Sequence, residues 1–446
     1  MRSPASKSIA TFLAAFALLL LAVRAQAQTV TNLASFHKAN GWYPEASLVQ
    51  GRNGNLYGTT ALGGLYNAGT LFTVTPNGRL NTLHNFTYYE GYEPSTLVLD
   101  KYGDFYGITA LGGPGGSGTI FRITPSGDYS IVYAFHGDEG ASPNSLAIGP
   151  DGNLYGTFAW PGSAGYFFRV SPAGQSSPVP CAVAGAYSLT MGPDGYFYGT
   201  TSLGGNEYGS IFRLRPNGAC ETMHTFDGTD GEAPSYLTSD GNGNYYGSTA
   251  AGGTGLERLG TFFQISSSGE FSVLFNYPGT MQPLSLGLAL GSDGNLYGTN
   301  LWGGIYGGGL VYQMTPNGSC NTLAFFGAEA YYTLRAMTQH TSGVFYGVSA
   351  EGGNQGNGNV FSFDNSLPPF LGLVAGFGHP GNNTQFLGQG FTGTTAVSFN
   401  GVPASSFKVI SDTYMTAVVP AGATTGLVTV TTPTGPLTSK LNFVVE

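Results

Sequence analysis

Short alternating runs of apolar and polar residues, separated by glycine-containing turns, recur along most of the chain. The unit is clearest between Ser47 and Phe86, where we predict strands at 48–49, 56–61, 70–75 and 80–86. Asn-Gly and Asp-Gly pairs supply the positive φ angles that tight hairpins need. The Gly63-Gly64 pair marks a longer loop. This pattern predicts a four-stranded antiparallel meander.

A Tyr-Gly pair marks seven copies of this unit. Its tyrosines are Tyr57, Tyr106, Tyr155, Tyr198, Tyr246, Tyr297 and Tyr346, with spacings of 49, 49, 43, 48, 51 and 49 residues. A period of about 50 residues is typical of stacked sheets or propellers. A lone four-stranded sheet would expose both faces, so repeated sheets must pack against one another. We therefore expect an all-β protein in which residues 28–366 form a seven-bladed β-propeller.

Both ends of the repeated region predict how it closes. Residues 31–36 match the fourth-strand pattern of 81–86, yet they precede the first full unit. The last unit runs through Val360 to Phe363 and then meets Leu367-Pro368-Pro369, where a fourth strand should begin. We expect residues 30–37 to complete the last blade.

The pattern changes after Pro369, because the Tyr-Gly pairs stop and small, polar and β-branched residues alternate. Such a change indicates a separate domain. We predict strands at 384–390, 396–399, 413–419, 426–432 and 441–444. Residues 367–446 are expected to form an immunoglobulin-like β-sandwich.

Two family resemblances accompany these patterns. The string Leu-Tyr-Gly-Thr-Thr, followed by Gly-Gly and then by Gly-Thr, a hydrophobic residue and Phe, as at 56–72, resembles the GloVer tandem repeat of exported bacterial proteins over residues 30–364. That resemblance implies export and architecture, and no particular activity. The segments Gly390-Phe391, 397–401, 418–420 and 426–430 resemble the IPT/TIG family, whose members serve as spacers, interaction modules and, in a minority, nucleic-acid binders. Lys408 and Lys440 are the only Lys or Arg residues in this part of the sequence, so we do not expect the last role.

Composition agrees with this fold class. The 446 residues include 72 glycines and 25 prolines, which disfavour helix interiors and exclude a helical bundle. Hydrophobic residues make up 41 %, which excludes a largely disordered chain.

The first 27 residues have the pattern of a secretory signal peptide. Arg2 and Lys7 precede an apolar run from Ile9 to Val23, and the segment ends in Ala25-Gln26-Ala27. We expect cleavage after Ala27 and secretion to the periplasm or beyond, with an uncleaved anchor as the alternative. No later segment is predicted to span a membrane.

Charge and cysteine content limit the partners. Removing the leader takes away Arg2, Lys7 and Arg24, three of the 15 basic residues, and leaves 12 against 24 acidic ones. Such a chain is not expected to bind nucleic acid. We expect Cys181, Cys220 and Cys320 to be reduced, with a bridge between residues 181 and 220 as the less favoured alternative.

The propeller prediction sorts the loops onto two ends. We call the end with the Asp/Asn-Gly hairpins, such as 51–54 and 75–78, the lower face. The upper face is the end with the Gly-Gly loops, such as 62–69, and the returns to the next blade, such as 86–91. Its loops hold twelve of the 24 acidic residues: Glu45, Glu90, Glu93, Asp138, Glu139, Glu207, Asp227, Asp230, Glu232, Glu257, Glu329 and Glu351. The basic residues assigned to these loops are Lys38 and Arg258, so we expect an acidic, aromatic-rich surface.

Aromatic platforms and carboxylates suit a neutral sugar or a cationic peptide. We therefore predict a non-enzymatic binding or cell-surface interaction protein for an extracellular glycan or protein. The candidate ligand-binding residues are Trp42, Tyr43, Glu90, Tyr92, Glu93, Asp138, Glu139, Trp160, Asp230, Glu232 and Trp302. In one alternative these side chains only cover blade edges and keep the protein soluble. In the other, paired carboxylates make it a glycoside hydrolase of neutral polysaccharide.

No metal, cofactor or catalytic arrangement is predicted. His37 matches His136 and His84 matches His224 in different repeats, so these histidines are expected to stand apart. The Asp-Gly-Asn turns lack the ligand ladder of a calcium loop.

Overall fold

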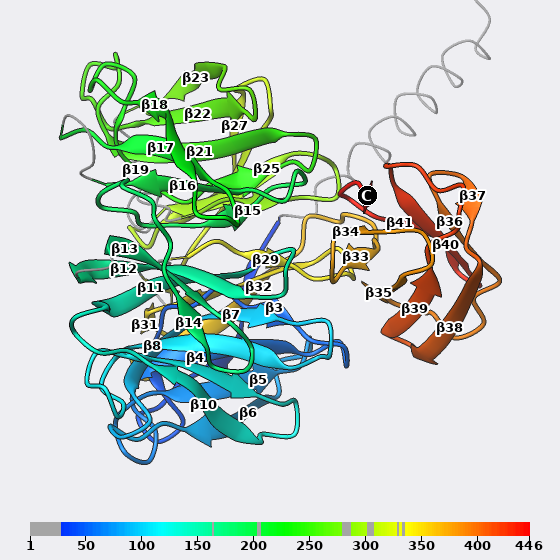
Figure 1. The fold of residues 1–446 in the computed structure, drawn as a ribbon, viewed down its shortest axis with the longest axis horizontal. Coiled ribbons are helices and arrows are strands. Elements are labelled where there is room, and N and C mark those ends of the chain that lie inside the picture. Colours follow the sequence, from blue (N-terminus) through cyan, green and yellow to red (C-terminus); the bar gives the residue numbers. More distant parts are fainter. Residues whose placement is uncertain are drawn as a thin grey trace, which may run out of the picture.

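The computed structural model describes residues 28–162, 165–202, 207–278, 287–300, 307–327, 330–331 and 335–446. These residues form strands, turns and loops without a helix, which confirms the all-β prediction (Figure 1). Within this part of the chain, no helix is long and apolar enough to cross a membrane. The predicted signal peptide, residues 1–27, lies outside the described residues.

The described part of residues 30–363, which we call the repeat region, forms seven antiparallel sheets of four or five strands. The first three comprise β2 (Trp42–Pro44), β3 (Val49–Gln50), β4 (Leu56–Leu62), β5 (Thr70–Val74) and β6 (Leu80–Asn85); β7 (Tyr92–Leu99), β8 (Phe105–Leu111), β9 (Thr119–Ile123) and β10 (Tyr129–Ala134); and β11 (Gly140–Ile148), β12 (Leu154–Gly162), β13 (Gly165–Val170) and β14 (Ser176–Ser177). The fourth and fifth comprise β15 (Thr190–Met191), β16 (Phe197–Thr201), β17 (Ser210–Leu214) and β18 (Cys220–Thr225); and β19 (Glu232–Pro234), β20 (Thr238–Ser239), β21 (Asn244–Ala251), β22 (Thr261–Ser266) and β23 (Phe271–Asn276). The sixth comprises β24 (Ala289–Leu290), β25 (Leu296–Asn300), β26 (Leu310–Met314) and β27 (Cys320–Phe325).

The seventh sheet joins the two ends of the repeat region. Its strand order is β1 (Val30–Ser35), β32 (Asn359–Phe363), β30 (Phe345–Ser349) and β29 (Thr338–Gln339). β1 pairs antiparallel with β32 from Val30 opposite Phe363 to Ser35 opposite Asn359. A further two-stranded pairing joins β28 (Ala330–Tyr331) to β31 (Glu351–Gly352).

The first strands of consecutive sheets are linked to one another. The hydroxyl of Thr190 donates to the carbonyl of Leu237 at 2.7 Å, and that of Thr238 donates to Leu288 at 2.6 Å. Strand β3 contacts β7, β7 contacts β11 and β11 contacts β15, while β24 contacts both β20 and β29. Thr338 in β29 donates to the carbonyl of Leu48, immediately before β3. The contacts therefore return from the last sheet to the first.

The Tyr-Gly motif has a packing explanation. Tyr57 is buried against Phe105 of the next sheet, with ring centroids 4.2 Å apart. A Cβ on Gly58 would lie 2.6 Å from the Phe72 ring on the adjacent strand, so no other residue fits there. The same aromatic cover lies over the glycine of all seven pairs. The motif thus seals each sheet against the next and lets an aromatic ring lie flat on the backbone.

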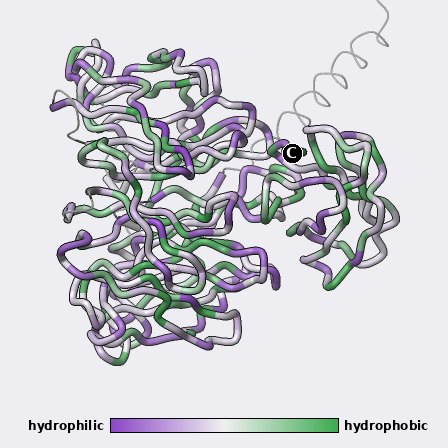
Figure 2. Tube along the Cα trace, viewed as in Figure 1, coloured by the Kyte–Doolittle hydropathy of each residue, from purple (hydrophilic) through white to green (hydrophobic). Residues whose placement is uncertain are grey.

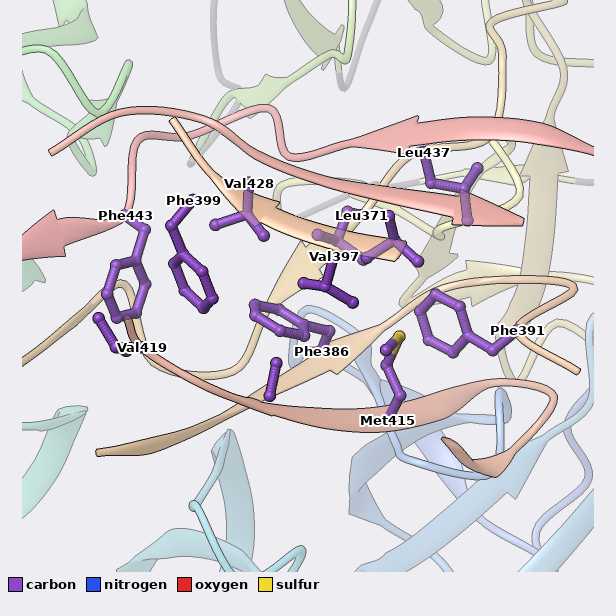
Figure 3. Close-up of a cluster of buried hydrophobic side chains, with 12 residues drawn as sticks. Leu371, Phe386, Phe391, Val397, Phe399, Met415, Val419, Val428, Leu437 and Phe443 are labelled. Carbon is purple, nitrogen blue, oxygen red and sulfur yellow. The ribbon is translucent and has the colours of Figure 1, made fainter. Parts of the chain in front are cut away.

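Residues 367–446, which we call the C-terminal module, form two main sheets around one core. One contains β33 (Gly372–Leu373), β35 (Asn383–Leu387), β39 (Tyr414–Val418) and β38 (Ser406–Ser411). The other contains β37 (Val402–Pro403), β36 (Ala396–Phe399), β40 (Val428–Thr432) and β41 (Gly435–Thr438), and β34 (Phe377–Gly378) pairs in parallel with β42 (Val444–Val445). Phe386 and Met415 of the first sheet face Phe399 and Val428 of the second (Figure 3). Hydrophobic stretches run through the repeat region and the module alike (Figure 2).

The prediction of three reduced cysteines is wrong. Cys181 and Cys220 form a disulfide with their Cα atoms 5.4 Å apart. The third sheet ends in the two-residue strand β14, and the irregular chain that follows packs beside the first residue of β18. Sequence spacing alone did not reveal this approach, because the return after β14 departs from the repeat. Cys320 carries a thiol, and burial raises its pKa to about 11.

Candidate functional site

Several returns between sheets on the upper face contain the same side-chain-to-backbone hydrogen bond. In four of them a side-chain oxygen accepts a hydrogen bond from the backbone N–H three residues earlier: Asn40 from His37 at 2.8 Å, Glu90 from Thr87 at 2.9 Å, Glu139 from His136 at 3.2 Å and Asp230 from Asp227 at 2.9 Å. A glycine with a φ between 109° and 142° follows each acceptor. An acceptor followed by glycine is therefore the structural signature of these returns.

Three predicted ligand-binding acids are engaged in this way. A side chain of the preceding outer strand also contacts each carboxylate: His84 lies 3.4 Å from Glu90, Tyr133 donates to Glu139, and His224 lies 2.7 Å from Asp230. The His224 ring in turn stacks on Phe271 with centroids 3.6 Å apart. These acids order their own loops, which leaves them less available to a ligand.

The predicted aromatics lie on separate loops. The ring of Trp42 faces the Lys38 ammonium at 5.3 Å, and Tyr92 packs edge-to-face on Tyr88 with centroids 5.0 Å apart. Trp160 in β12 is 71 % exposed. Trp302 lies outside the described residues.

The other predicted residues are also distributed by sheet. Asp138 is exposed in the return that precedes β11, and Glu232 is half-buried at the start of β19. Tyr43 and Glu93 both have positive φ values, 61° and 56°. The structure therefore places the candidates in several small groups, and one of them, Glu93, approaches a cluster that the sequence did not reveal.

That cluster consists of Glu45, Tyr187, Tyr236 and Arg335, which come from four different sheets. Glu45 lies between β2 and β3, and Tyr236 lies between β19 and β20. Tyr187 precedes β15, and Arg335 precedes β29. The Arg335 Nε donates to the carbonyl of Glu45 at 3.0 Å, and Nη1 donates to the Tyr236 hydroxyl. The Tyr187 and Tyr236 rings meet at 5.3 Å with an interplanar angle of 62°. We call these four residues the axial cluster, because the linked first strands of the sheets bring them together.

Burial and charge shape the chemistry of the axial cluster. Burial raises the pKa of the Glu45 carboxyl, Arg335 opposes this rise and Glu93 adds to it. Burial raises the pKa of Tyr187 to about 12. Burial lowers the pKa of Arg335, but Tyr236, Tyr187 and Glu45 together raise it above its ordinary value.

The axial cluster can form several kinds of contact with a polar ligand. All four side chains are half-buried, so they retain some solvent contact. No described residue donates a hydrogen bond to the Glu45 carboxylate, which leaves it as an acceptor. The guanidinium and the two tyrosine hydroxyls add donors, and the rings add apolar faces. Such a mixture suits a polyhydroxylated molecule.

Arg335 was not among the predicted site residues, because only Lys38 and Arg258 were expected as bases of the upper face. One signal could have found it. Arg335 precedes Ala336 and Met337 as Ala46 precedes Ser47 and Leu48, so a charged residue stands where another repeat has a small one. A register alignment of the seven units therefore marks it.

The described residues contain no group of three or more His, Cys, Asp or Glu side chains that could hold a metal ion. The histidines of matching repeats serve separate loops, as His84 and His224 do.

Solved structures with a similar fold come from diverse proteins. A fungal alcohol oxidase of the AA5 family, solved with copper, is 12 % identical with a TM-score of 0.54, and the match covers 94 % of this chain and all of that one. The extracellular domain of a one component system of Bacteroides thetaiotaomicron is 10 % identical with a TM-score of 0.51, covering 91 % of this chain and 57 % of that one. The extracellular domain of a hybrid two component system of the same organism is 13 % identical with a TM-score of 0.51, covering 91 % and 52 %. At these identities the likeness shows a propeller-like fold alone.

Sequence comparison gives the family directly. No curated protein matches this sequence. The family model described as the Gloeobacter/Verrucomicrobia repeat matches residues 19–170 and 146–361, most of the chain, which confirms the GloVer resemblance. The chain belongs to the Gloeobacter/Verrucomicrobia repeat family.

Proposed function

We propose that this protein is an exported, non-enzymatic binding protein that recognises an extracellular glycan at the axial cluster of its upper face. In this proposal, residues 28–366 are a seven-bladed β-propeller completed by residues 30–37, and residues 367–446 are an IPT/TIG-like immunoglobulin sandwich. The return of strand contacts from β29 to β3 and the pairing of β1 with β32 support the propeller. The two sheets that share the core around Phe386 support the sandwich.

Export is supported from two directions. A disulfide between Cys181 and Cys220 is typical of proteins that mature in an oxidising compartment. The leader pattern of residues 1–27 fits the same route. Two structural neighbours are themselves extracellular domains.

The observation that carries the binding proposal is the contact of Arg335 with Tyr236 and Glu45 across sheets. Residues from four sheets supply a cation, an acceptor and two aromatic hydroxyls in one place. Sugar hydroxyls both donate and accept hydrogen bonds, and the C–H face of a sugar packs on aromatic rings. A neutral glycan satisfies all of these groups.

The test is a neutral-oligosaccharide array on the mature protein, followed by calorimetry with the glycan that binds best. We expect Arg335→Met and Tyr187→Phe to weaken binding at least tenfold, the loss of about one charge-assisted hydrogen bond for the arginine. Arg79→Met serves as the control, because Arg79 is exposed beside a lower-face turn. An array without any bound glycan would overturn the function, and unchanged binding by Arg335→Met would overturn the site.

One observation supports a second candidate, a glycoside hydrolase of neutral polysaccharide. Glu45 has a raised pKa, and Glu93 is its electrostatic neighbour. Glycosidases use two carboxyl groups roughly 5–10 Å apart, one of them with a raised pKa. Turnover of a neutral polysaccharide that Glu45→Gln abolishes, while binding persists, would favour this candidate.

A further inference from the structure

The lower face of the repeat region meets the C-terminal module over a cavity of about 290 Å³. Figure 1 shows the module standing beside the repeat region. Strands β3 and β29 contribute Val49, Gln50 and Gln339 to the lining. The module contributes the segment 370–374 and Lys440. This volume lies at the small end of ligand pockets, which begin at about 300 Å³.

The cavity is apolar except for a few polar groups, and Lys440 is the only titratable side chain among its described lining residues. Its Nζ donates to the carbonyl of Leu290 at 2.9 Å and lies 4.8 Å from the centre of the Phe370 ring. No ion pair among the described residues includes Lys440. Desolvation lowers its pKa to about 8. An ammonium has three N–H donors. Among the described residues, the Lys440 ammonium has the Leu290 carbonyl as its acceptor and has no anionic partner.

A second polar group in the cavity lining is an acceptor that lacks a hydrogen-bond donor among the described residues. Gln339 is 6 % exposed, and its Nε2 donates to Ser292 Oγ and to the carbonyl of Gly343, both at 3.1 Å. Because a carbonyl can only accept, the contact with Gly343 fixes which end of the amide is nitrogen. Gln339 Oε1 is then buried without a hydrogen-bond donor among the described residues. A buried acceptor left in this state is unfavourable, so a donor is expected there.

We propose that this cavity binds a medium-chain hydroxylated fatty acid. The carboxylate contacts the Lys440 ammonium, the alkyl chain lies along Leu48, Val49 and Leu373, and the hydroxyl donates to Gln339 Oε1. Charge complementarity selects an acid over an alcohol or amine. The apolar lining selects an alkyl chain over a sugar. This inference does not depend on the proposed glycan site, which lies at the other end of the first strands.

The test is calorimetric titration of the mature full-length protein with 3-hydroxyoctanoate, octanoate and octylamine. We expect 3-hydroxyoctanoate to bind about five- to tenfold more tightly than octanoate, the ratio that one hydrogen bond supplies, and octylamine not to bind. Lys440→Met should abolish binding of both acids. Lys408→Met is the control, because Lys408 is an exposed lysine of the same module. Gln339→Leu should make the two acids equal.

A readout on the wild-type protein guards against a variant that does not fold. Trinitrobenzenesulfonate should modify Lys440, and 3-hydroxyoctanoate should protect it, as peptide mass spectrometry measures. The proposal is overturned if neither acid binds at millimolar concentration, which would mean that water alone fills the cavity. It is also overturned if folded Lys440→Met binds as wild type does, or if bound acid leaves Lys440 modification unchanged.

Discussion

The lower face and the upper face of the repeat region are built from the same repeats, but their loops make different contacts. On the lower face the Asp/Asn-Gly turns are short, and the C-terminal module packs on several of them. Arg52 donates to Gln385 at 2.6 Å, Gln389 donates to Thr341 at 2.9 Å, and Asn442 donates to Asn242 at 2.8 Å. On the upper face the returns are longer and are fastened by their own acceptors.

This difference indicates which side chains are already used within the protein and which can contact a ligand. Side chains of the lower turns that bind the module are no longer open to a partner. The upper returns also use acids such as Glu90 internally, so the proposed glycan site relies on the axial cluster and the exposed aromatics. Trp160 at 71 % and Tyr89 at 73 % exposure are the clearest of these aromatics. Surface acidity alone does not single out the proposed site.

The largest expected effect compares a crowded glycine of the upper returns with an open glycine of the lower turns. A Cβ on Gly91 of the upper face, where φ is 109°, would lie 2.0 Å from Thr109 Oγ1. We expect Gly91→Ala to lower the free energy of unfolding by about 4 kcal/mol, from overpacking and backbone strain together. Thermal unfolding followed by circular dichroism measures it.

Gly294 is the matched lower-face control. Its φ is 79°, and nothing lies within 4 Å of an added Cβ. Gly294→Ala should lower stability by about 1 kcal/mol, the strain of a left-handed residue alone. Equal losses for the two variants would contradict the close packing of Gly91 against Thr109.

The next effect concerns the disulfide beside the irregular return of the third sheet. Cys181 and Cys220 are separated by 39 residues, and a cross-link over such a loop stabilises by about 3 kcal/mol. Cys181→Ser and Cys220→Ser should each lower stability by that amount, while Cys320→Ser should have a smaller effect. Free-thiol titration of the unfolded, unreduced protein checks the pairing: one thiol is expected, and three would refute the bridge.

Local chemistry explains what the sequence could predict. The strand at 396–399 lies at its predicted residues as β36, and the turn glycines and the Tyr-Gly pairs report contacts within one unit or between neighbouring units. Strand β2 was not predicted, because Trp42–Pro44 lies before Ser47, where the predicted repeat unit begins. The disulfide depends on the irregular return between two neighbouring sheets, and the axial cluster depends on how distant units meet. Only Arg335, which stands in register with the small residue Ala46, left a trace in the sequence.

A smaller effect should follow from loosening the lower face. The Arg52 guanidinium lies 4.4 Å over the Tyr414 ring and donates to Gln385 and to the carbonyl of Lys101. Arg52→Met should weaken docking of the C-terminal module by about 2 kcal/mol. Faster proteolysis in the linker near Pro368 is the measurement, with Arg79→Met as control. Identical cleavage rates would show that other contacts hold the module.

The last comparison is between the two desolvated cations of the two faces. The pKa of Lys440 is lowered to about 8 in the folded protein, whereas an unfolded lysine titrates near pH 10.4. Between these values the unfolded chain binds more protons, so the Lys440 contribution to stability rises with pH from about 8 to about 10 and is constant below. The stability of wild type minus that of Lys440→Met should therefore grow over this window, because the tyrosines titrate in both proteins and cancel. Arg335 stays charged throughout, so the same difference taken with Arg335→Met should change much less. A flat Lys440 difference would show that the lower-face ammonium is as well solvated as an exposed one.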